Sequence, residues 1–199
     1  MSGPSSSDPE IPAIAAWRHV DARVGFEVLF LRREGDRYHL DGHSTAVQEG
    51  EAWGIRYALE LDTDWATRAA HIVGQSAMGM NEVRLEGDGR GMWRVDGRPT
   101  SQLDGCLDVD LEASAATNSL PVRRLGLRVG EGADAPAVYV RAPILRVERL
   151  EQSYARIPND GDQRARFDYV APAFDFKAVL VYDRFGFILD YPGIAVRVA

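Results

Sequence analysis

The densest group of side chains that could do chemistry is the acidic segment Leu103–Leu111, which reads LDGCLDVDL. If this segment is extended, Asp108 and Asp110 point to the same face, about 7 Å apart. Two carboxylates placed in this way could pair with arginine, contact a ligand, hold a cation or work as an acid–base pair. A calcium loop of the helix-loop-helix kind needs a third acidic position and a central glycine, and we find neither here.

The segment Thr117–Leu125 follows and supplies arginines that could face those carboxylates. Its Thr-Asn-Ser start is typical of a turn, and we read the residues after it as a strand. On a strand, Arg123 lies on the same side as Leu125, whereas Arg124 lies on the other side. We therefore predict that Arg123 is buried and pairs with a carboxylate of the acidic segment, because a buried guanidinium requires an acceptor. The pair would be either a structural network or a clamp for a sugar or phosphate head group.

Histidines are sparse, but His39, Asp41 and His43 would share one face of a strand, as metal ligands do. Asp41-Gly42 is a turn signal, and a turn there would separate the three side chains. The sequence also contains no complete nucleophile elbow and no phosphate-binding loop. We therefore predict no catalytic residue, no metal site and no cofactor.

The four tryptophans, Trp17, Trp53, Trp65 and Trp93, are scattered singly along the chain. Such residues either fill a core or form an apolar lining against which a ligand stacks. Periodicity does not separate these two roles.

The elements that must position these side chains are strands. Apolar and polar residues alternate with period two in Trp53–Leu61, in Phe167–Tyr169 and in Phe174–Tyr182. Only Asp64–Ile72 suggests a helix, and it is short. Turn signals separate the strands at Glu34–Asp36, Asp41–Gly42, Glu86–Gly89, Asp96–Gly97 and Asn159–Gly161.

This spacing predicts an all-β fold, a long antiparallel meander. Because strand twist accumulates and open edges invite aggregation, we expect the meander to curl into a spiral β-roll or open barrel. A rolled sheet with aromatic strands commonly encloses an elongated apolar cavity.

Composition limits the function. The chain has 199 residues, 45% of them apolar, and a formal net charge of −7. The acidic balance argues against nucleic-acid binding, which needs a basic face. Cys106 is the only cysteine, which excludes an intrachain disulfide.

The chain shows neither a signal peptide nor an apolar run long enough to be a transmembrane segment. We therefore expect a cytoplasmic protein with a flexible leader at 1–16 and one domain at 17–199.

The chain resembles a bacterial family described as putative glycolipid-binding proteins. The resemblance covers nearly the whole chain from Trp17. It departs from the family pattern at Ala115 and Ala116, where a proline and an apolar residue are expected. It is carried by Trp53–Arg68 with its D-W-x-x-R ending, Leu85–Gly89 with Trp93, Leu103–Leu125 with G-C-x-D-V-D-L and T-N-x-L-P-x-R-R-L, Glu151–Tyr154, Phe167–Tyr169 and Tyr191-Pro192.

The resemblance implies a many-stranded β-roll that binds a glycolipid or another amphipathic small molecule without catalysis. The acyl chain would enter the roll, and the polar head would lie near the Asp–Arg belt. The alternatives are an enzyme that acts on a small polar substrate at the Asp/Arg cluster, and a protein-interaction domain without a small ligand. As ligand-binding residues we predict Trp53, Tyr57, Trp65, Arg68, Trp93, Asp108, Asp110, Asn118, Arg123, Tyr154 and Tyr169.

Overall fold

The structure, a computed structural model, describes residues 11–199. Residues 1–10, the larger part of the predicted leader, lie outside the described residues. The first strand, β1, begins at Ile14, before the predicted domain boundary at Trp17. 

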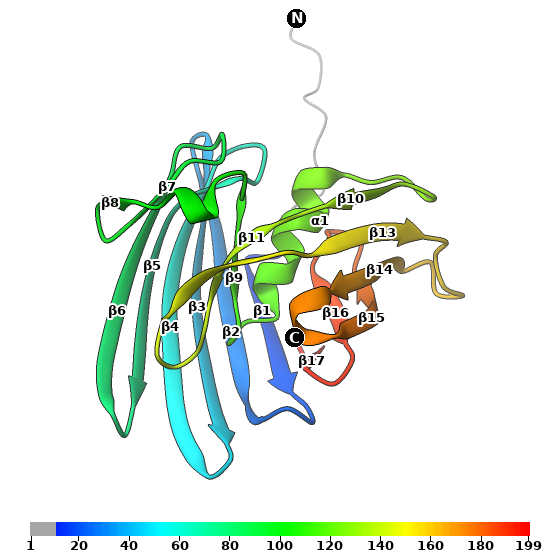
Figure 1. Cartoon of the computed structure of the whole chain (residues 1–199). Coiled ribbons are helices and arrows are strands. Elements are labelled where there is room, and N and C mark those ends of the chain that lie inside the picture. The colour runs from blue at the N-terminus through cyan, green and yellow to red at the C-terminus, as the bar shows by residue number, and fades with distance from the viewer. Residues whose placement is uncertain (1–10) are drawn as a thin grey trace, which may run out of the picture.

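The first half of the chain is an antiparallel meander in which each strand pairs with the next (Figure 1). Its strands are β1 (Ile14–His19), β2 (Val24–Glu34), β3 (Arg37–Gln48), β4 (Glu51–Leu61), β5 (Thr67–Ser76), β6 (Gly79–Gly87), β7 (Trp93–Val95) and β8 (Arg98–Pro99). Strand β4 contains the predicted strand Trp53–Leu61, and its odd-numbered residues from 53 to 61 are buried. The helix suggested at Asp64–Ile72 is wrong, because β5 already begins at Thr67.

The C-terminal strands extend the same sheet on the other side of β1. They are β10 (Gly132–Asp134), β13 (Ser153–Ile157), β14 (Ala165–Ala171), β15 (Phe176–Tyr182), β16 (Ile188–Tyr191) and β17 (Ala195–Arg197). Strand β17 pairs with β1, so the two ends of the described chain lie side by side. The sheet has 14 strands and ends at β10 and β8. It is a curved sheet that does not close, which confirms the predicted all-β open barrel.

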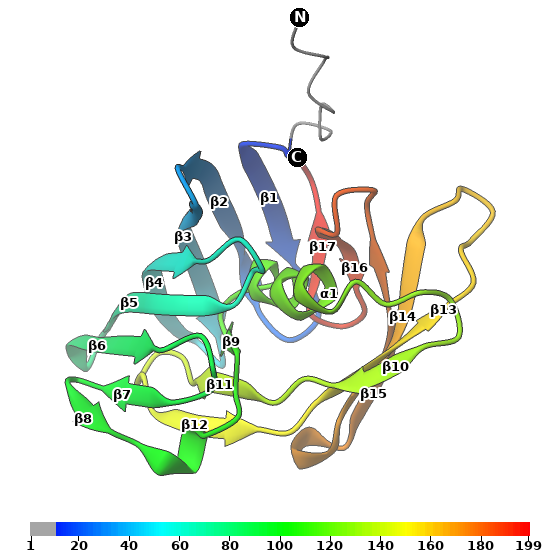
Figure 2. The ribbon, with the colours of Figure 1, turned by 90° about the horizontal axis from the view of Figure 1, so that it is seen from above.

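A second sheet of three strands packs within the concave side (Figure 2). It consists of β9 (Asp108–Leu111), β11 (Ala137–Val140) and β12 (Val147–Leu150). β9 and β11 run parallel, an exception to the predicted antiparallel pairing. Every residue of β9 is buried, so its two aspartates lie inside the protein.

The predicted strand within Thr117–Leu125 is wrong. The helical elements are η1 (Ser101–Leu103), η2 (Ala116–Asn118), α1 (Ser119–Leu125) and η3 (Pro172–Phe174). We call η2 and α1 together the plug, because α1, which follows η2 directly, lies inside the curve of the large sheet (Figure 2). A helix satisfies its own backbone groups where no neighbouring strand is available to pair with it. Gly126 ends α1 in the left-handed region with a φ of +55°.

The turn predicted at Asp41-Gly42 is wrong, because both residues lie in the middle of β3. Gly42 pairs with Tyr57 across the strands, and a Cβ at this position would lie 1.9 Å from Cζ of that tyrosine. The glycine therefore makes room for the Tyr57 ring on the inner face. His39, Asp41 and His43 remain on one outer face, where Asp41 accepts a hydrogen bond from the Arg32 guanidinium.

The core lies between the concave face of the large sheet, the plug and the three-stranded sheet. Within residues 11–199, packed side chains therefore occupy much of the space inside the sheet where we expected an elongated cavity. The largest fully buried side chains include Trp17, Leu29, Leu40, Tyr57, Ile72, Tyr154, Tyr182 and Phe187.

Candidate functional site

Two hollows flank the plug. One, of about 280 Å³, is lined by Asn118 at the junction of η2 and α1; the other, of about 870 Å³, is lined by Val122 and Arg123 further along α1. We call the first the tyrosine pocket and the second the arginine pocket. The tyrosine pocket is lined by Arg23, Gln48, Asp110, Glu112, Ser114, Asn118, Tyr139, Arg141, Tyr169, Phe174, Phe176, Tyr191 and apolar neighbours. The arginine pocket is lined by Ile11, Ala13, Leu31, Arg32, Arg33, Tyr38, Trp65, Val122, Arg123, Arg184, Phe185 and Gly186.

The loop before the plug is held in place by a buried carboxylate on the large sheet. Glu27 of β2 is fully buried and accepts hydrogen bonds from the Tyr57 hydroxyl (2.6 Å) and the Ser114 hydroxyl. It also accepts the backbone N–H groups of Ala115 (2.7 Å) and Ala116 (3.3 Å). Burial raises the pKa of this carboxyl, and the four donors oppose the shift. Glu27 thus ties the start of the plug to the sheet and fixes the wall of the tyrosine pocket.

Asp110 is the buried acid of the tyrosine pocket. The Thr117 hydroxyl donates to it at 3.2 Å. Burial raises its pKa to about 7, the nearby carboxylates of Asp108 and Glu112 add to the rise, and the Thr117 hydrogen bond opposes it. This carboxyl therefore changes its charge near neutral pH and can either donate or accept a hydrogen bond there.

The aromatic wall of the pocket comes from strands β14 to β16. The rings of Tyr169 and Tyr191 meet edge to face at a centroid distance of 6.0 Å, and Phe176 lies 5.9 Å from Tyr191. Tyr139 of β11 faces Phe174 at 5.5 Å. The half-exposed Phe174 marks the rim.

Arg23 supplies a buried guanidinium to this pocket. It is 8% exposed, it donates to the backbone oxygen of Glu112 at 2.5 Å, and it lies over the Trp53 ring at 5.5 Å. Its Nε atom makes no hydrogen bond within residues 11–199. A buried donor of this kind is costly unless a water molecule or another acceptor bonds to it.

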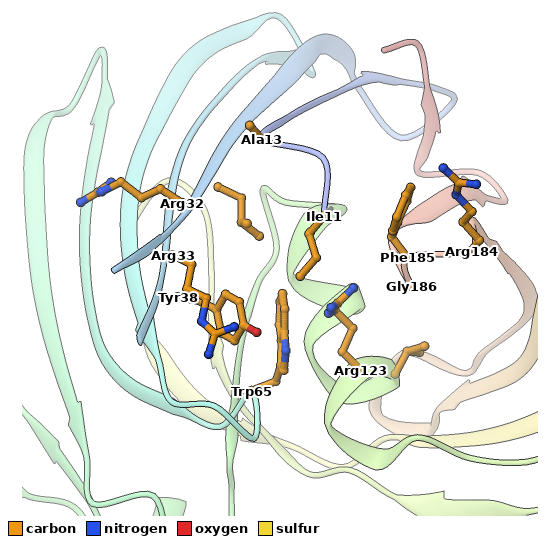
Figure 3. A pocket seen from close by; sticks show the side chains of 12 residues that line it. Ile11, Ala13, Arg32, Arg33, Tyr38, Trp65, Arg123, Arg184, Phe185 and Gly186 are labelled. Atoms are coloured by element: carbon orange, nitrogen blue, oxygen red, sulfur yellow. The ribbon is translucent and has the colours of Figure 1, made fainter. Parts of the chain in front are cut away.

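The arginine pocket is larger than the tyrosine pocket. Its charged groups are arginines, and some of them lie beside aromatic rings (Figure 3). The Arg123 guanidinium stacks on the Trp65 ring at 3.8 Å, and Trp65 stacks on Tyr38 at 4.5 Å. Arg33 lies over the Tyr38 ring at 5.5 Å. Guanidinium groups therefore stand at both ends of an aromatic stack.

The predicted site residues divide into three groups. Asp110, Asn118 and Tyr169 line the tyrosine pocket, whereas Trp65 and Arg123 line the arginine pocket. The structure thus separates residues that we had placed around one ligand. The remaining predicted residues line neither pocket: Trp53, Tyr57, Arg68, Trp93, Asp108 and Tyr154.

The residues of this last group have structural contacts. Arg68 approaches Asp62 and the backbone oxygen of Gly87, and the Trp93 indole donates to the backbone oxygen of Cys106 at 2.8 Å. The Tyr154 hydroxyl supports the tyrosine pocket from behind, because it donates to Oδ1 of Asn118 at 2.9 Å.

The two adjacent arginines exchange the roles that we predicted. Arg124 makes the buried ion pair with Asp108, with Nη2 at 2.6 Å and Nε at 3.0 Å from the carboxylate, while Arg123 turns to Trp65. The prediction failed because it assumed a strand; on a helix, adjacent side chains point about 100° apart instead of to opposite faces.

Four residues in or behind the tyrosine pocket were not among the predicted site residues: Arg23, Glu27, Tyr139 and Tyr191. Glu27 could have been found, because it precedes Leu29 and Leu31 at even spacing and so occupies an inward position of β2. The other three come from separate segments, and only the folded chain brings them to one pocket.

No helix within residues 11–199 is long and apolar enough to span a membrane.

Comparison with known proteins agrees with this architecture. Among the solved structures, a DUF1089 family protein from Pseudomonas aeruginosa superposes with a TM-score of 0.72, with 30% sequence identity over 100% of this chain and 99% of that one. A β-barrel-like protein of a domain of unknown function, DUF1849, from Brucella abortus has a TM-score of 0.52 at 12% identity, with 94% of each chain covered, and this likeness concerns the fold alone. No curated protein matches the chain. The family model described as "Putative glycolipid-binding" matches residues 14–197, so the chain belongs to that family.

Proposed function

We propose that the protein binds an amphipathic, sugar-bearing ligand without transforming it, and that the sugar occupies the tyrosine pocket. The observation that carries this proposal is the lining of that pocket. Carboxyl, amide, hydroxyl and guanidinium groups converge there beside the aromatic faces of Phe174 and Phe176. Sugar rings need both partners, hydrogen bonds for their hydroxyls and an apolar face for their C–H groups. The name of the family supports the same class of ligand.

The size of the tyrosine pocket limits what it can hold. A hollow of about 280 Å³ is at the small end of ligand sites, which commonly range from about 300 to 1,000 Å³. One sugar ring would fill it. A sugar ring that fills this pocket leaves no room in it for an acyl chain, so the chain would leave over the rim at Phe174, which is 42% exposed.

Calorimetric titration with alkyl glucosides of increasing length, each below its micelle concentration, tests the proposal. Affinity should rise by up to about fourfold for each methylene that the rim covers, since burying one contributes about 0.8 kcal/mol. It should then reach a plateau. Tyr139→Phe should weaken binding roughly threefold to tenfold by removing one hydroxyl from the pocket.

Tyr38→Phe is the matched control, because it removes the same atom from the arginine pocket. Equal losses in the two variants, or no saturable binding by folded and lipid-free protein, would contradict the proposal. Protein interaction would then be the leading function, since Ile14 and Phe30 pair on the outer face of β1 and β2 with both side chains about half exposed.

A second candidate function is acid–base catalysis on a small polar substrate. One observation favours it: Asp110 has a pKa of about 7 inside a polar pocket, and perturbed carboxyls of this kind are common in active sites. Mass spectrometry of a bound ligand after prolonged incubation tests it. Conversion that disappears in Asp110→Asn would establish catalysis, and an unchanged ligand would exclude it for that compound.

A further inference from the structure

The tyrosine pocket contains a buried cation, Arg23, that forms no ion pair within residues 11–199. Arg23 is 8% exposed, and its hydrogen bond goes to a neutral acceptor, the backbone oxygen of Glu112 at 2.5 Å. The centre of the Trp53 ring lies 5.5 Å from the guanidinium carbon. Buried charges in proteins are generally paired with an opposite charge, because burial removes the water that stabilises them. Burial accordingly lowers the pKa of Arg23.

The carboxylates nearest to this cation are held by other donors. Glu112 and Glu27 both attract Arg23 from a distance. Oε2 of Glu112 accepts the N–H group of Ala142 at 2.9 Å, and Glu27 accepts the N–H group of Ala115 at 2.7 Å. In the described part of the chain, neither carboxylate approaches the guanidinium closely enough to form an ion pair. A negative group that enters the pocket would therefore meet a cation whose charge is only partly compensated.

The position of Arg23 brings its guanidinium to the wall of the tyrosine pocket. Two backbone hydrogen bonds hold the turn between β1 and β2 that carries it. The N–H group of Val20 donates to Ile194 at 3.0 Å, and that of Ala22 donates to Gly193 at 3.2 Å. The hollow has room for about one sugar ring, at about 280 Å³, so a substituent of that ring would lie within reach of the guanidinium.

The other charged groups of the lining decide how strongly an anion would be favoured. Burial raises the pKa of Asp110 to about 7, so near neutral pH this carboxyl can carry a proton and donate to a carboxylate of the ligand. Arg141 is paired with Glu148 at 2.6 Å, and we therefore assign the contact to Arg23 alone. The carboxylate of Glu112 would repel a second anion, which limits the expected preference to a moderate one.

We propose that the sugar bound in the tyrosine pocket is an acidic one, a uronic acid glycoside whose carboxylate accepts hydrogen bonds from the Arg23 guanidinium. This inference rests on the sugar-binding function proposed above, and it names the class of sugar. Hydrogen bonds between two charged groups are stronger than those between neutral groups. The carboxylate would therefore distinguish the acidic glycoside from a neutral glycoside of the same size.

Calorimetric titration of the full chain at pH 7 with octyl glucuronide and octyl glucoside, each below its micelle concentration, tests this inference. The two ligands share the ring and the alkyl chain, and they differ in that a carboxylate replaces a hydroxymethyl group. The glucuronide should bind about tenfold more tightly, the lower end of the gain from a hydrogen bond to a charged group. Equal affinities would overturn the assignment of an acidic sugar and leave the proposed sugar binding intact.

Variants of Arg23 test whether this side chain causes the preference. Arg23→Gln removes the charge but keeps N–H groups for the backbone oxygen of Glu112. It should lower the affinity for the glucuronide about tenfold and leave that for the glucoside within about threefold. Arg23→Lys keeps the charge and should retain part of the preference. Arg56→Gln removes the same charge from an exposed position outside the pocket and should leave both affinities within about twofold.

Thermal unfolding establishes that each variant is folded before it is titrated. If Arg23→Gln does not fold, the two glycosides on the unmodified protein and on Arg23→Lys still decide the question. A preference for the glucuronide that persists in full in folded Arg23→Gln would overturn the role of Arg23. No saturable binding of either glycoside by the unmodified protein would overturn the proposed sugar binding itself, and this inference with it.

Discussion

The tyrosine pocket and the arginine pocket lie against one ten-residue plug, 116–125. They differ in the sign and the burial of their charged side chains. In and behind the tyrosine pocket, Glu27 and Asp110 are buried, and hydroxyl and backbone donors of the same chain bond to them. In the arginine pocket, Arg33 and Arg184 are exposed and lie on aromatic rings. The first arrangement holds the start of the plug in place, because the donors that bond to these carboxyls come from the plug and the loop before it. The second leaves the charged groups of Arg33 and Arg184 exposed to solvent.

This difference teaches that burial alone does not mark a binding group. Asp108 and Asp110 are neighbours on one face of β9, both at most 6% exposed. Asp108 is bound by Arg124, whereas within residues 11–199 the side chain that bonds to Asp110 is the neutral Thr117 hydroxyl, and Asp110 lines a hollow. The acid with less internal compensation is therefore the better candidate for contact with a ligand.

The largest expected effect concerns the two adjacent arginines. Arg124→Ala strands the buried Asp108 carboxylate and should lower the free energy of unfolding by about 3–5 kcal/mol. Arg123→Ala removes a stacking contact with Trp65 and should cost about 0.5–2 kcal/mol. Denaturant midpoints of the two variants, measured at pH 7, give the comparison.

The double variant Asp108→Asn/Arg124→Ala serves as the control, because it removes the stranded charge together with its partner. It should be more stable than Arg124→Ala alone. If Arg123→Ala proved as destabilising as Arg124→Ala, the division between structural and accessible arginines would be wrong.

Much of the fold follows from local patterns in the sequence. The alternation in β4 and the turn at Glu34–Asp36 depend on neighbours in the chain, and the structure has both. The shared face of Asp108 and Asp110 also follows from β9 being extended. Period two and turn chemistry are sufficient for such features.

The wrong predictions of secondary structure occur where contacts with residues distant in the sequence decide the conformation. Gly42 reads as a turn residue, but it is needed to accommodate the Tyr57 ring from the next strand. The residues after Thr117 read as a strand, but their place inside the concavity favours a helix. Each pocket is assembled from widely separated segments, such as Arg23, Asp110 and Tyr191. No local pattern indicates that these three side chains meet.

A smaller effect concerns the pH dependence of stability. The pKa of Asp110 is about 7 in the folded protein, against about 3.9 when unfolded. Between these values the folded state holds the extra proton, so the contribution of Asp110 to stability is fully present below about pH 4 and is lost as the pH rises through about 7. The loss is at most about 4 kcal/mol.

Asp110→Asn removes this dependence and should therefore flatten the fall in stability between pH 4 and 8. Denaturant midpoints across that range, compared with those of the unmodified protein, measure the difference. Asp168→Asn removes the same charge from an exposed position and controls for net charge. Parallel profiles for Asp110→Asn and the unmodified protein would show that Asp110 is ionised in the folded state throughout, as a structural carboxylate would be.

The smallest expected effect is on the stability of the arginine pocket itself. Arg33 and Arg184 are exposed, and each rests on one aromatic ring at 5.5 Å or 4.6 Å. Contacts of this kind at exposed sites contribute about 0.5–1 kcal/mol, so Arg33→Ala and Arg184→Ala should each shift the free energy of unfolding by less than about 1 kcal/mol. Thermal unfolding at low salt measures this, with Arg124→Ala as the reference for an arginine that the fold requires. A loss of several kcal/mol in either variant would mean that these cations are structural, and the contrast between the two pockets would disappear. A small loss in both variants would show that the fold does not depend on these two side chains, in contrast to Arg124, whose guanidinium pairs with the buried Asp108.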